Sequence, residues 1–159
     1  MPVRTEFDIV RDMRSAARTA PTVHVLMATI CHSLAHRLNG YNWVGFYMLD
    51  PKDPNMLLLG PFVGAQTPHT RIPLNQGVCG AAVSQGQTIV VDDVQSDPRY
   101  LSCSLDTKSE IVAPVFVHGK IAGELDIDSH EAARFKQEDR DLVEKCAQIV
   151  GEYLEQRRG

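Results

Sequence analysis

The chain has 159 residues, of which 43% are hydrophobic and 23% charged, and its formal net charge at neutral pH is −4. A chain of this size and composition is typical of one globular domain with a sizeable core. It lacks the basic runs that favour nucleic acid, and no apolar run approaches the ~20 residues that span a bilayer, so we expect no nucleic-acid partner, no membrane partner and a cytoplasmic location.

The first 40 residues are predicted to form two helices. In the second helix, apolar residues recur at helical spacing between Val23 and Leu38, and Gly40 follows as a C-terminal stop. Cys31 lies on the apolar face of this helix. Free cysteines in such positions pack as small hydrophobes, so we interpret Cys31 as a core residue.

The period changes to two at "NWVGFYML", residues 42–49, and again over 55–62, which predicts two strands. Trp43, Gly45 and Tyr47 share one face of the first strand, and the glycine is expected to leave a gap between the two rings. Rings on either side of a gap could clamp a small ligand. Aromatic side chains packed under a loop would give the same pattern, so the pair alone leaves both interpretations open.

A short helix is predicted over about residues 78–84, within "NQGVCGAAV". Gly77 and Gly80 flank Cys79, and backbone N–H groups at a helix start could receive an anion and lower the pKa of the thiol. Cys79 could equally be a close-packed small residue. The spacing does not choose between a reactive and an inert Cys79.

Cys103 lies in the polar segment "RYLSCSLDTKSEIV", residues 99–112, where an inert cysteine is unexpected. An exposed thiol carries an oxidation risk, so its presence in a loop indicates a use for its reactivity. The four cysteines of the chain include no C-x-x-C pair, and we expect free thiols at rest in a reducing compartment.

Three further strands are predicted over 87–93, 109–117 and 120–128, and His118 and Gly119 form a two-residue hairpin turn between the last two. Side chains alternate along the last strand, which assigns one face to core residues and the other to acids: Ile121, Gly123, Leu125 and Ile127 against Glu124, Asp126 and Asp128. The acidic face is either a solvated sheet surface or part of a site.

A helix over about 137–157 closes the chain, beginning with an acidic turn at Glu138 and Asp139 and placing Cys146 among its core residues. We therefore predict a single α+β domain over 1–159, with N-terminal helices over 1–40, a sheet with its loops over 41–130, and the C-terminal helix. Because turns and one short helix link most strands, the sheet is expected to be antiparallel, with the terminal helices on one face.

Several segments occur in an order that carries a family resemblance: "NWVGFY", "LLLGPF", "NQGVCGAA", "VDDV", "SEIVAPV" and "GELDIDS", followed by Phe135 and "QED". With them the chain resembles the GAF-domain enzymes that reduce free methionine-(R)-sulfoxide. The resemblance implies a GAF-like fold with a ligand pocket on the sheet face opposite the terminal helices.

The resemblance also implies roles for seven residues. Cys103 corresponds to the cysteine that attacks the sulfoxide and Cys79 to a second redox cysteine. The substrate pocket would be formed by Trp43, Tyr47, Glu110, Asp126 and Asp128. It implies no bound cofactor and no metal, with thioredoxin as the external reductant.

The chemistry of these residues agrees with such a role. Carboxylates in a partly desolvated pocket attract the ammonium group of a free amino acid and reject a peptide-bound residue that lacks it. Clustered carboxylates also repel one another, so one should hold a proton, and Glu110 is our candidate to donate it to the sulfoxide oxygen. Attack by Cys103 would leave a sulfenic acid, which condenses with another thiol to a disulfide that thioredoxin reduces.

The chain departs from the family pattern at His69, where a third redox cysteine usually stands. We expect either Cys79 or an external thiol to resolve Cys103. Three alternatives stay open: a metal bound by His69, Cys79 and Cys103, a GAF sensor domain that binds a small molecule without converting it, and a degenerate reductase that binds without turnover. A homodimer formed through the N-terminal helices is also left open.

Overall fold

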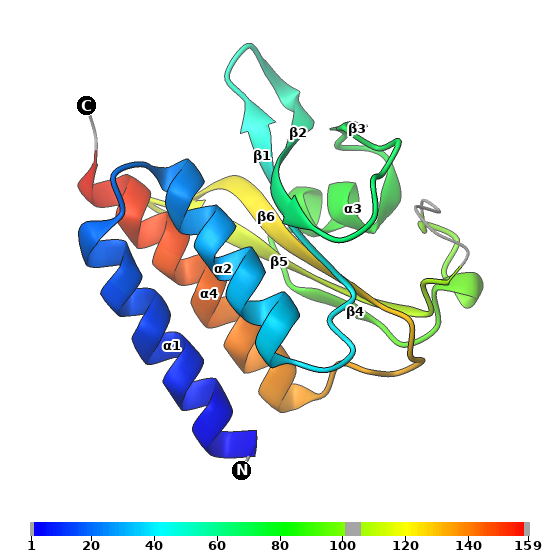
Figure 1. The fold of residues 1–159 in the computed structure, drawn as a ribbon. Coiled ribbons are helices and arrows are strands. Elements are labelled where there is room, and N and C mark those ends of the chain that lie inside the picture. The colour runs from blue at the N-terminus through cyan, green and yellow to red at the C-terminus, as the bar shows by residue number, and fades with distance from the viewer. Residues whose placement is uncertain (1, 101–105, 158–159) are drawn as a thin grey trace.

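A computed structural model describes residues 2–100 and 106–157 (Figure 1). In chain order the elements are α1 (Pro2–Thr19), α2 (Val23–Arg37), β1 (Trp43–Asp50), β2 (Asp53–Val63), β3 (Arg71–Pro73), α3 (Gly77–Gln85), β4 (Ile89–Val91), a 3₁₀ turn η1 (Val94–Ser96), β5 (Ser109–Val117), β6 (Lys120–Ser129) and α4 (Gln137–Gln156). Within the described residues, no helix is both long enough and apolar enough to cross a membrane.

The strands form one antiparallel sheet in the order β3-β2-β1-β6-β5-β4, which confirms the predicted α+β fold with an antiparallel sheet. The predicted hairpin between β5 and β6 is also confirmed, because His118 and Gly119 both have positive φ, as a two-residue turn between twisted strands requires. The strand β3 was not predicted. It is three residues long and therefore too short to display an alternation.

The helices α1, α2 and α4 lie side by side on one face of the sheet (Figure 1). Apolar residues of α2 and α4 pack on alternate residues of the strands, including Phe46, Ile111, Leu125 and Ile127, and α1 packs on α2 and α4 to complete the larger core. Cys31 and Cys146 lie within this core and are fully buried, as predicted.

The opposite face of the sheet is covered by the short helix α3, which together with Trp43, Tyr47, Leu57 and Val112 forms a second apolar cluster. Ile121 packs against this second cluster, so its assignment to the helix-covered face was wrong. The cause is a β-bulge: Val115 and Phe116 pair with Gly123 and Ile121, and the extra residue reverses the alternation at that point. From Gly123 onward the predicted alternation holds.

Candidate functional site

The register of the sheet brings the predicted acidic residues together on the α3 face. Glu124, Asp126 and Asp128 follow one another at every second position of β6, which forms the centre of the sheet with β1. On one side of β6, the strand β1 places Tyr47 opposite Glu124, Gly45 opposite Asp126 and Trp43 opposite Asp128. On the other side, β5 places Pro114, Val112 and Glu110 opposite the same three acids, in the same order. Glu110 therefore lies directly opposite Asp128, and a column of carboxyl groups runs between an aromatic strand and an aliphatic one.

All four carboxyl groups are buried. The exposed fractions are 5% for Glu110, 0% for Glu124, 3% for Asp126 and 4% for Asp128, which rules out the interpretation of a solvated acidic face. Both carboxyl oxygens of Glu124, Oδ1 of Asp126 and Oδ1 of Asp128 have no hydrogen-bond partner among the residues that the structure describes. Buried acids in this state create a strong demand for a donor or a cation.

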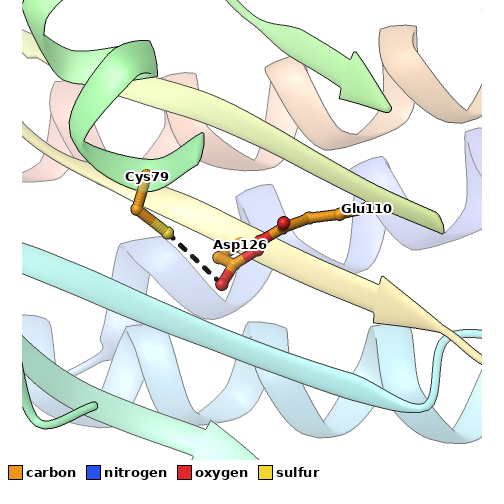
Figure 2. Close-up of side chains that lie close together, drawn as sticks. All are labelled: Cys79, Glu110 and Asp126. Carbon is orange, nitrogen blue, oxygen red and sulfur yellow. Dashed lines mark hydrogen bonds between the residues drawn. The ribbon is translucent and has the colours of Figure 1, made fainter. Parts of the chain in front are cut away.

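Cys79 reaches this column from the first turn of α3. Gly77 starts the helix with a φ of 72°, and Gly80 lets the helix approach the preceding turn so closely that an added Cβ would lie 2.7 Å from the carbonyl oxygen of Leu74. The buried thiol consequently points down at the sheet and donates a hydrogen bond from Sγ to Oδ2 of Asp126, at 3.4 Å (Figure 2).

The electrostatics of the column favour protonated groups. Burial, followed by the nearby carboxyls of Asp126, Glu124 and Glu110, raises the pKa of Cys79 well above its ordinary value, which favours the close-packed interpretation of Cys79 over a thiol activated by the helix start. Burial, followed by repulsion from Asp126 and Asp128, likewise raises the pKa of Glu110 well above its usual range.

The other acids follow the same rule. Burial raises the pKa of Glu124 and of Asp128 well above the ordinary value of a carboxyl group, against an opposing effect of Cys79 on Glu124 and of Glu110 on Asp128. It also raises the pKa of Asp126, but hydrogen bonds from Glu110 and Cys79 act in the opposite direction. Asp126 is therefore the acid whose ionised form its neighbours support best, and Glu110 is the one best placed to share a proton with it.

The rings beside the column do not flank an open gap, so that expectation was wrong. The Trp43 ring lies over Gly45, where any Cβ would clash with it, and it stacks on Tyr47 and on Phe62 with centroid separations of 6.2 and 5.5 Å. Trp43 Nε1 donates to the carbonyl of Ala65 at 3.0 Å. The segment after β2 thereby fixes the tryptophan ring in a stacked aromatic wall.

Tyr47 connects the same segment to the site, because its hydroxyl donates to the backbone carbonyl of His69 at 2.8 Å. The described group of potential metal ligands around Cys79 consists of Cys79, Glu110 and Asp126, without His69. Cys103 lies outside the described residues, so its predicted role as the attacking cysteine and the set of His69, Cys79 and Cys103 both remain predictions.

The described residues on either side of 101–105 border the site. Tyr100 packs against the α3-side cluster. On the other side, Thr107 is buried and the backbone N–H of Lys108 donates to the carbonyl of Ser129, the residue after Asp128, at 2.8 Å. Both flanks of this segment are thus anchored around the acidic column.

Glu124 is the site residue that sequence reasoning missed. It had been assigned to the acidic face but not to the substrate pocket, although it stands two residues before Asp126 on the same face and is the most deeply buried of the four acids. The signal that points to it is the unbroken spacing of two along "GELDIDS".

Comparison with known proteins gives one consistent result. A family model described as GAF domain matches residues 22–154. Protein YtsP of Bacillus subtilis is 40% identical over 123 residues, 77% of this chain and 74% of the relative. Free methionine-R-sulfoxide reductase of Escherichia coli is 36% identical over 153 residues, 92% of this chain and 90% of the relative.

Among solved structures, free methionine-R-sulfoxide reductase from Neisseria meningitidis, in complex with its substrate, superposes with a TM-score of 0.90 at 33% identity. The match covers 96% of this chain and 90% of that one. The similarity therefore extends over the sheet, the terminal helices and the acidic column together.

Proposed function

The chain belongs to the GAF domain family and is homologous to the free methionine-R-sulfoxide reductases, and from this premise we propose that it reduces free L-methionine-(R)-sulfoxide to L-methionine. The observation that carries the proposal is the column of buried carboxyl groups with unpartnered oxygens, next to an aromatic wall and a thiol. A small zwitterion that carries one ammonium group and one sulfinyl group matches this combination of donors and rings.

The acids would bind the ammonium group. Three N–H donors can satisfy the free oxygens of Asp126 and Asp128, and the positive charge would offset the cost of ionised carboxyls in a buried site. A methionine sulfoxide inside a peptide has no such ammonium group and would leave the acids without a cation. This difference is the physical basis for selecting the free amino acid.

The aromatic wall would hold the methylsulfinyl group. Trp43 and Tyr47 present stacked ring surfaces at the edge of the column, and their hydrogen bonds to Ala65 and His69 limit their rotation. A fixed wall on one side of the sulfur determines which of its faces meets the attacking thiolate. Discrimination between the (R) and (S) epimers follows from that orientation.

In the proposed reaction the Cys103 thiolate attacks the sulfoxide sulfur while Glu110 protonates the sulfoxide oxygen. The S–O bond of the substrate breaks, the oxygen is transferred to Cys103 as a sulfenic acid, and methionine leaves with its sulfur reduced by two electrons. A thiol then attacks the sulfenic acid, which forms a disulfide and releases water. Thioredoxin, as a dithiol in the cytoplasm, reduces this disulfide and returns Cys103 to the thiol.

The resolving thiol is proposed to be Cys79 or an external thiol, since His69 stands where the family usually has a third cysteine. Cys79 begins as a neutral thiol hydrogen-bonded to Asp126, and it must leave that hydrogen bond to reach Cys103. Mass-spectrometric mapping after one turnover without reductant distinguishes a Cys79–Cys103 disulfide from an adduct with an added thiol. A bridge from Cys103 to Cys31 or Cys146 would contradict both.

The activity test offers three substrates to the purified chain with a thioredoxin system: the free (R) epimer, the free (S) epimer and a peptide-bound sulfoxide. We expect turnover of the free (R) epimer alone, and its complete loss in Cys103→Ser. Turnover that survives in Cys103→Ser, or a preference for the peptide, would refute the proposed mechanism.

His69 favours a second candidate, a GAF domain that binds methionine sulfoxide without reducing it. The turnover assay and a calorimetric titration together identify this case. The assay would record no release of methionine, while calorimetry would record binding of the free sulfoxide. The acidic column and the aromatic wall serve both functions, so only turnover separates them.

A further inference from the structure

The side chains of Cys79, Glu110 and Asp126 converge from three different elements, α3, β5 and β6. Sγ of the cysteine and one carboxyl oxygen of each acid lie within 4.8 Å of one another, and all three residues are buried. Figure 2 shows the Cys79 sulfur directed at the Asp126 carboxyl, with Glu110 reaching in from the neighbouring strand. One sulfur and two oxygen donors in this arrangement are ligands that zinc accepts in proteins.

We propose that these three side chains form a binding site for a divalent zinc-like cation, and that the bound cation excludes the ammonium group of the substrate. The binding site stands on the geometry alone. The exclusion rests on the proposed function, because it assumes that the same acids hold the ammonium group.

The spacing suits a tetrahedral ion after a small adjustment. With metal–ligand bonds of about 2.0 to 2.3 Å, the ligands of tetrahedral zinc stand roughly 3.3 to 3.8 Å apart. The three ligand atoms lie within 4.8 Å, and the Sγ and Oδ2 of Cys79 and Asp126 are already 3.4 Å apart. A side-chain movement of Glu110 toward the other two ligands would close the remaining difference.

The free oxygens of the column are the second observation that points to a cation. Oδ1 of Asp126 has no partner among the described residues, and neither has either carboxyl oxygen of the fully buried Glu124. A carboxyl that is buried without a donor gains more from a cation than an exposed one does, because water has already been removed from it.

The donor set selects the class of metal. A thiolate sulfur prefers zinc and related transition metals, whereas calcium and magnesium require oxygen ligands throughout. Binding releases the thiol proton of Cys79 and the proton shared by the acids, and forms one metal–sulfur bond and two metal–oxygen bonds. No electron is transferred, so the cysteine stays reduced and the step is reversible by a chelator.

Cobalt(II) provides a test that needs no turnover, because a cobalt thiolate has a charge-transfer band in the near ultraviolet. The reduced full-length chain should bind one equivalent of Co²⁺ with this band, and Zn²⁺ should displace it. Cys79→Ser should abolish the band and weaken affinity by about 100-fold or more, and Asp126→Asn should weaken affinity by about 10- to 100-fold while the band remains at saturation. The proposed metal site would be refuted if the wild-type chain bound no Co²⁺, or if the charge-transfer band survived in Cys79→Ser.

Cys103→Ser is the matched control, since it removes the other cysteine of the predicted site but none of the three ligands. It should keep the cobalt band, and because it is expected not to turn over, free methionine sulfoxide can be added to it. The sulfoxide should raise the apparent dissociation constant for Co²⁺. Unchanged cobalt affinity at saturating sulfoxide would overturn the exclusion.

The two proposals fail in distinguishable ways. Reductase activity in a chain that binds no cobalt refutes the metal site and leaves the proposed function standing. A cobalt band in a chain without turnover supports the site and refutes the reductase.

Discussion

The two faces of the sheet are both buried, but they differ in what they bury. Beneath α1, α2 and α4 the strands contribute apolar side chains such as Leu125 and Ile127, which pack at no electrostatic cost. Beneath α3 the same strands contribute four buried carboxyl groups next to the second apolar cluster. Burial alone therefore does not identify an apolar core. The face on which burial removes carboxyl groups from water, at a cost in free energy, is the face that we expect to bind a ligand.

β6 contains this difference within three consecutive residues. Glu124 and Asp126 point to the α3 face, and Leu125 between them points to the helices. All three are almost completely buried, so substitutions at the three positions compare the two faces at equal depth and in the same strand. The following predictions use this comparison, from the largest expected effect to the smallest.

Among the substitutions on the sheet, Asp126→Asn should cause the largest loss of activity. The amide keeps the size of the carboxyl but removes the charge proposed to bind the ammonium group, so we expect kcat/KM for free methionine-(R)-sulfoxide to fall about 10³-fold, roughly 4 kcal/mol. Thermal unfolding should show no loss of stability, since a buried charge has been removed. A variant that keeps activity within tenfold of wild type would place the ammonium group elsewhere.

Leu125→Ala should have the opposite profile. The fully buried leucine belongs to the helix-side core, and its truncation leaves a cavity that should cost about 3 kcal/mol in the free energy of unfolding, measured by urea titration. In folded protein, kcat/KM should stay within a factor of about 3 of wild type. An activity loss as large as that of Asp126→Asn would mean that the two faces are not functionally separate.

Glu124→Met should stabilise the chain. Methionine has a similar volume, and it replaces a carboxyl whose oxygens have no partner among the described residues, so we expect a gain of about 1 to 2 kcal/mol without ligand. The same change at the exposed Glu131 is the control and should stay within about 0.5 kcal/mol of wild type. A loss of stability in Glu124→Met would contradict the view of an acid kept for a ligand.

The stability gained in Glu124→Met should also depend on pH. Burial raises the pKa of Glu124 in the folded chain, where Cys79 from α3 and Asp126 from β6 face it, and Tyr47 stands opposite on β1. The folded state then holds a proton that the unfolded state releases above its ordinary pKa near 4.5, so wild type loses stability as the pH rises. The difference between Glu124→Met and wild type should widen from about pH 4.5 upward, in urea titrations at a series of pH values.

The sequence was sufficient for the helices and the long strands, because periods of 3.6 and 2 are local properties. It also placed Glu124, Asp126 and Asp128 on one face, for the same reason. It did not reveal that this face is buried, because its burial depends on α3. Cys79 of α3 contacts Asp126, a residue 47 positions later in the sequence. A contact of that range leaves no local signal.

Two errors have a similar origin. Ile121 was assigned to the wrong face because a single bulged residue reverses an alternation without changing composition. The gap at Gly45 was expected because the glycine has no side chain, but the rotamer of Trp43 fills that space, and a rotamer is set by tertiary packing. Both errors concern shape at the site, whereas the residue types themselves were identified.

The smallest effect is expected at a buried acid on the helix side, which completes the comparison. Asp139 is 6% exposed, like the column acids, but it accepts hydrogen bonds from the Tyr41 hydroxyl at 2.6 Å, from Arg134 at 3.0 Å and from the backbone of Lys136 at 2.9 Å. Tyr41→Phe removes one of these partners and should cost about 1 kcal/mol in unfolding free energy with kcat/KM unchanged, because the arginine and the backbone still satisfy the carboxylate. If the free energy of unfolding falls in Tyr41→Phe and rises in Glu124→Met, a buried acid stabilises this fold where its hydrogen-bond partners belong to the chain. It then destabilises the fold where the missing partner is a ligand. Equal signs would remove that distinction, since Asp139 and Glu124 would then differ only in position.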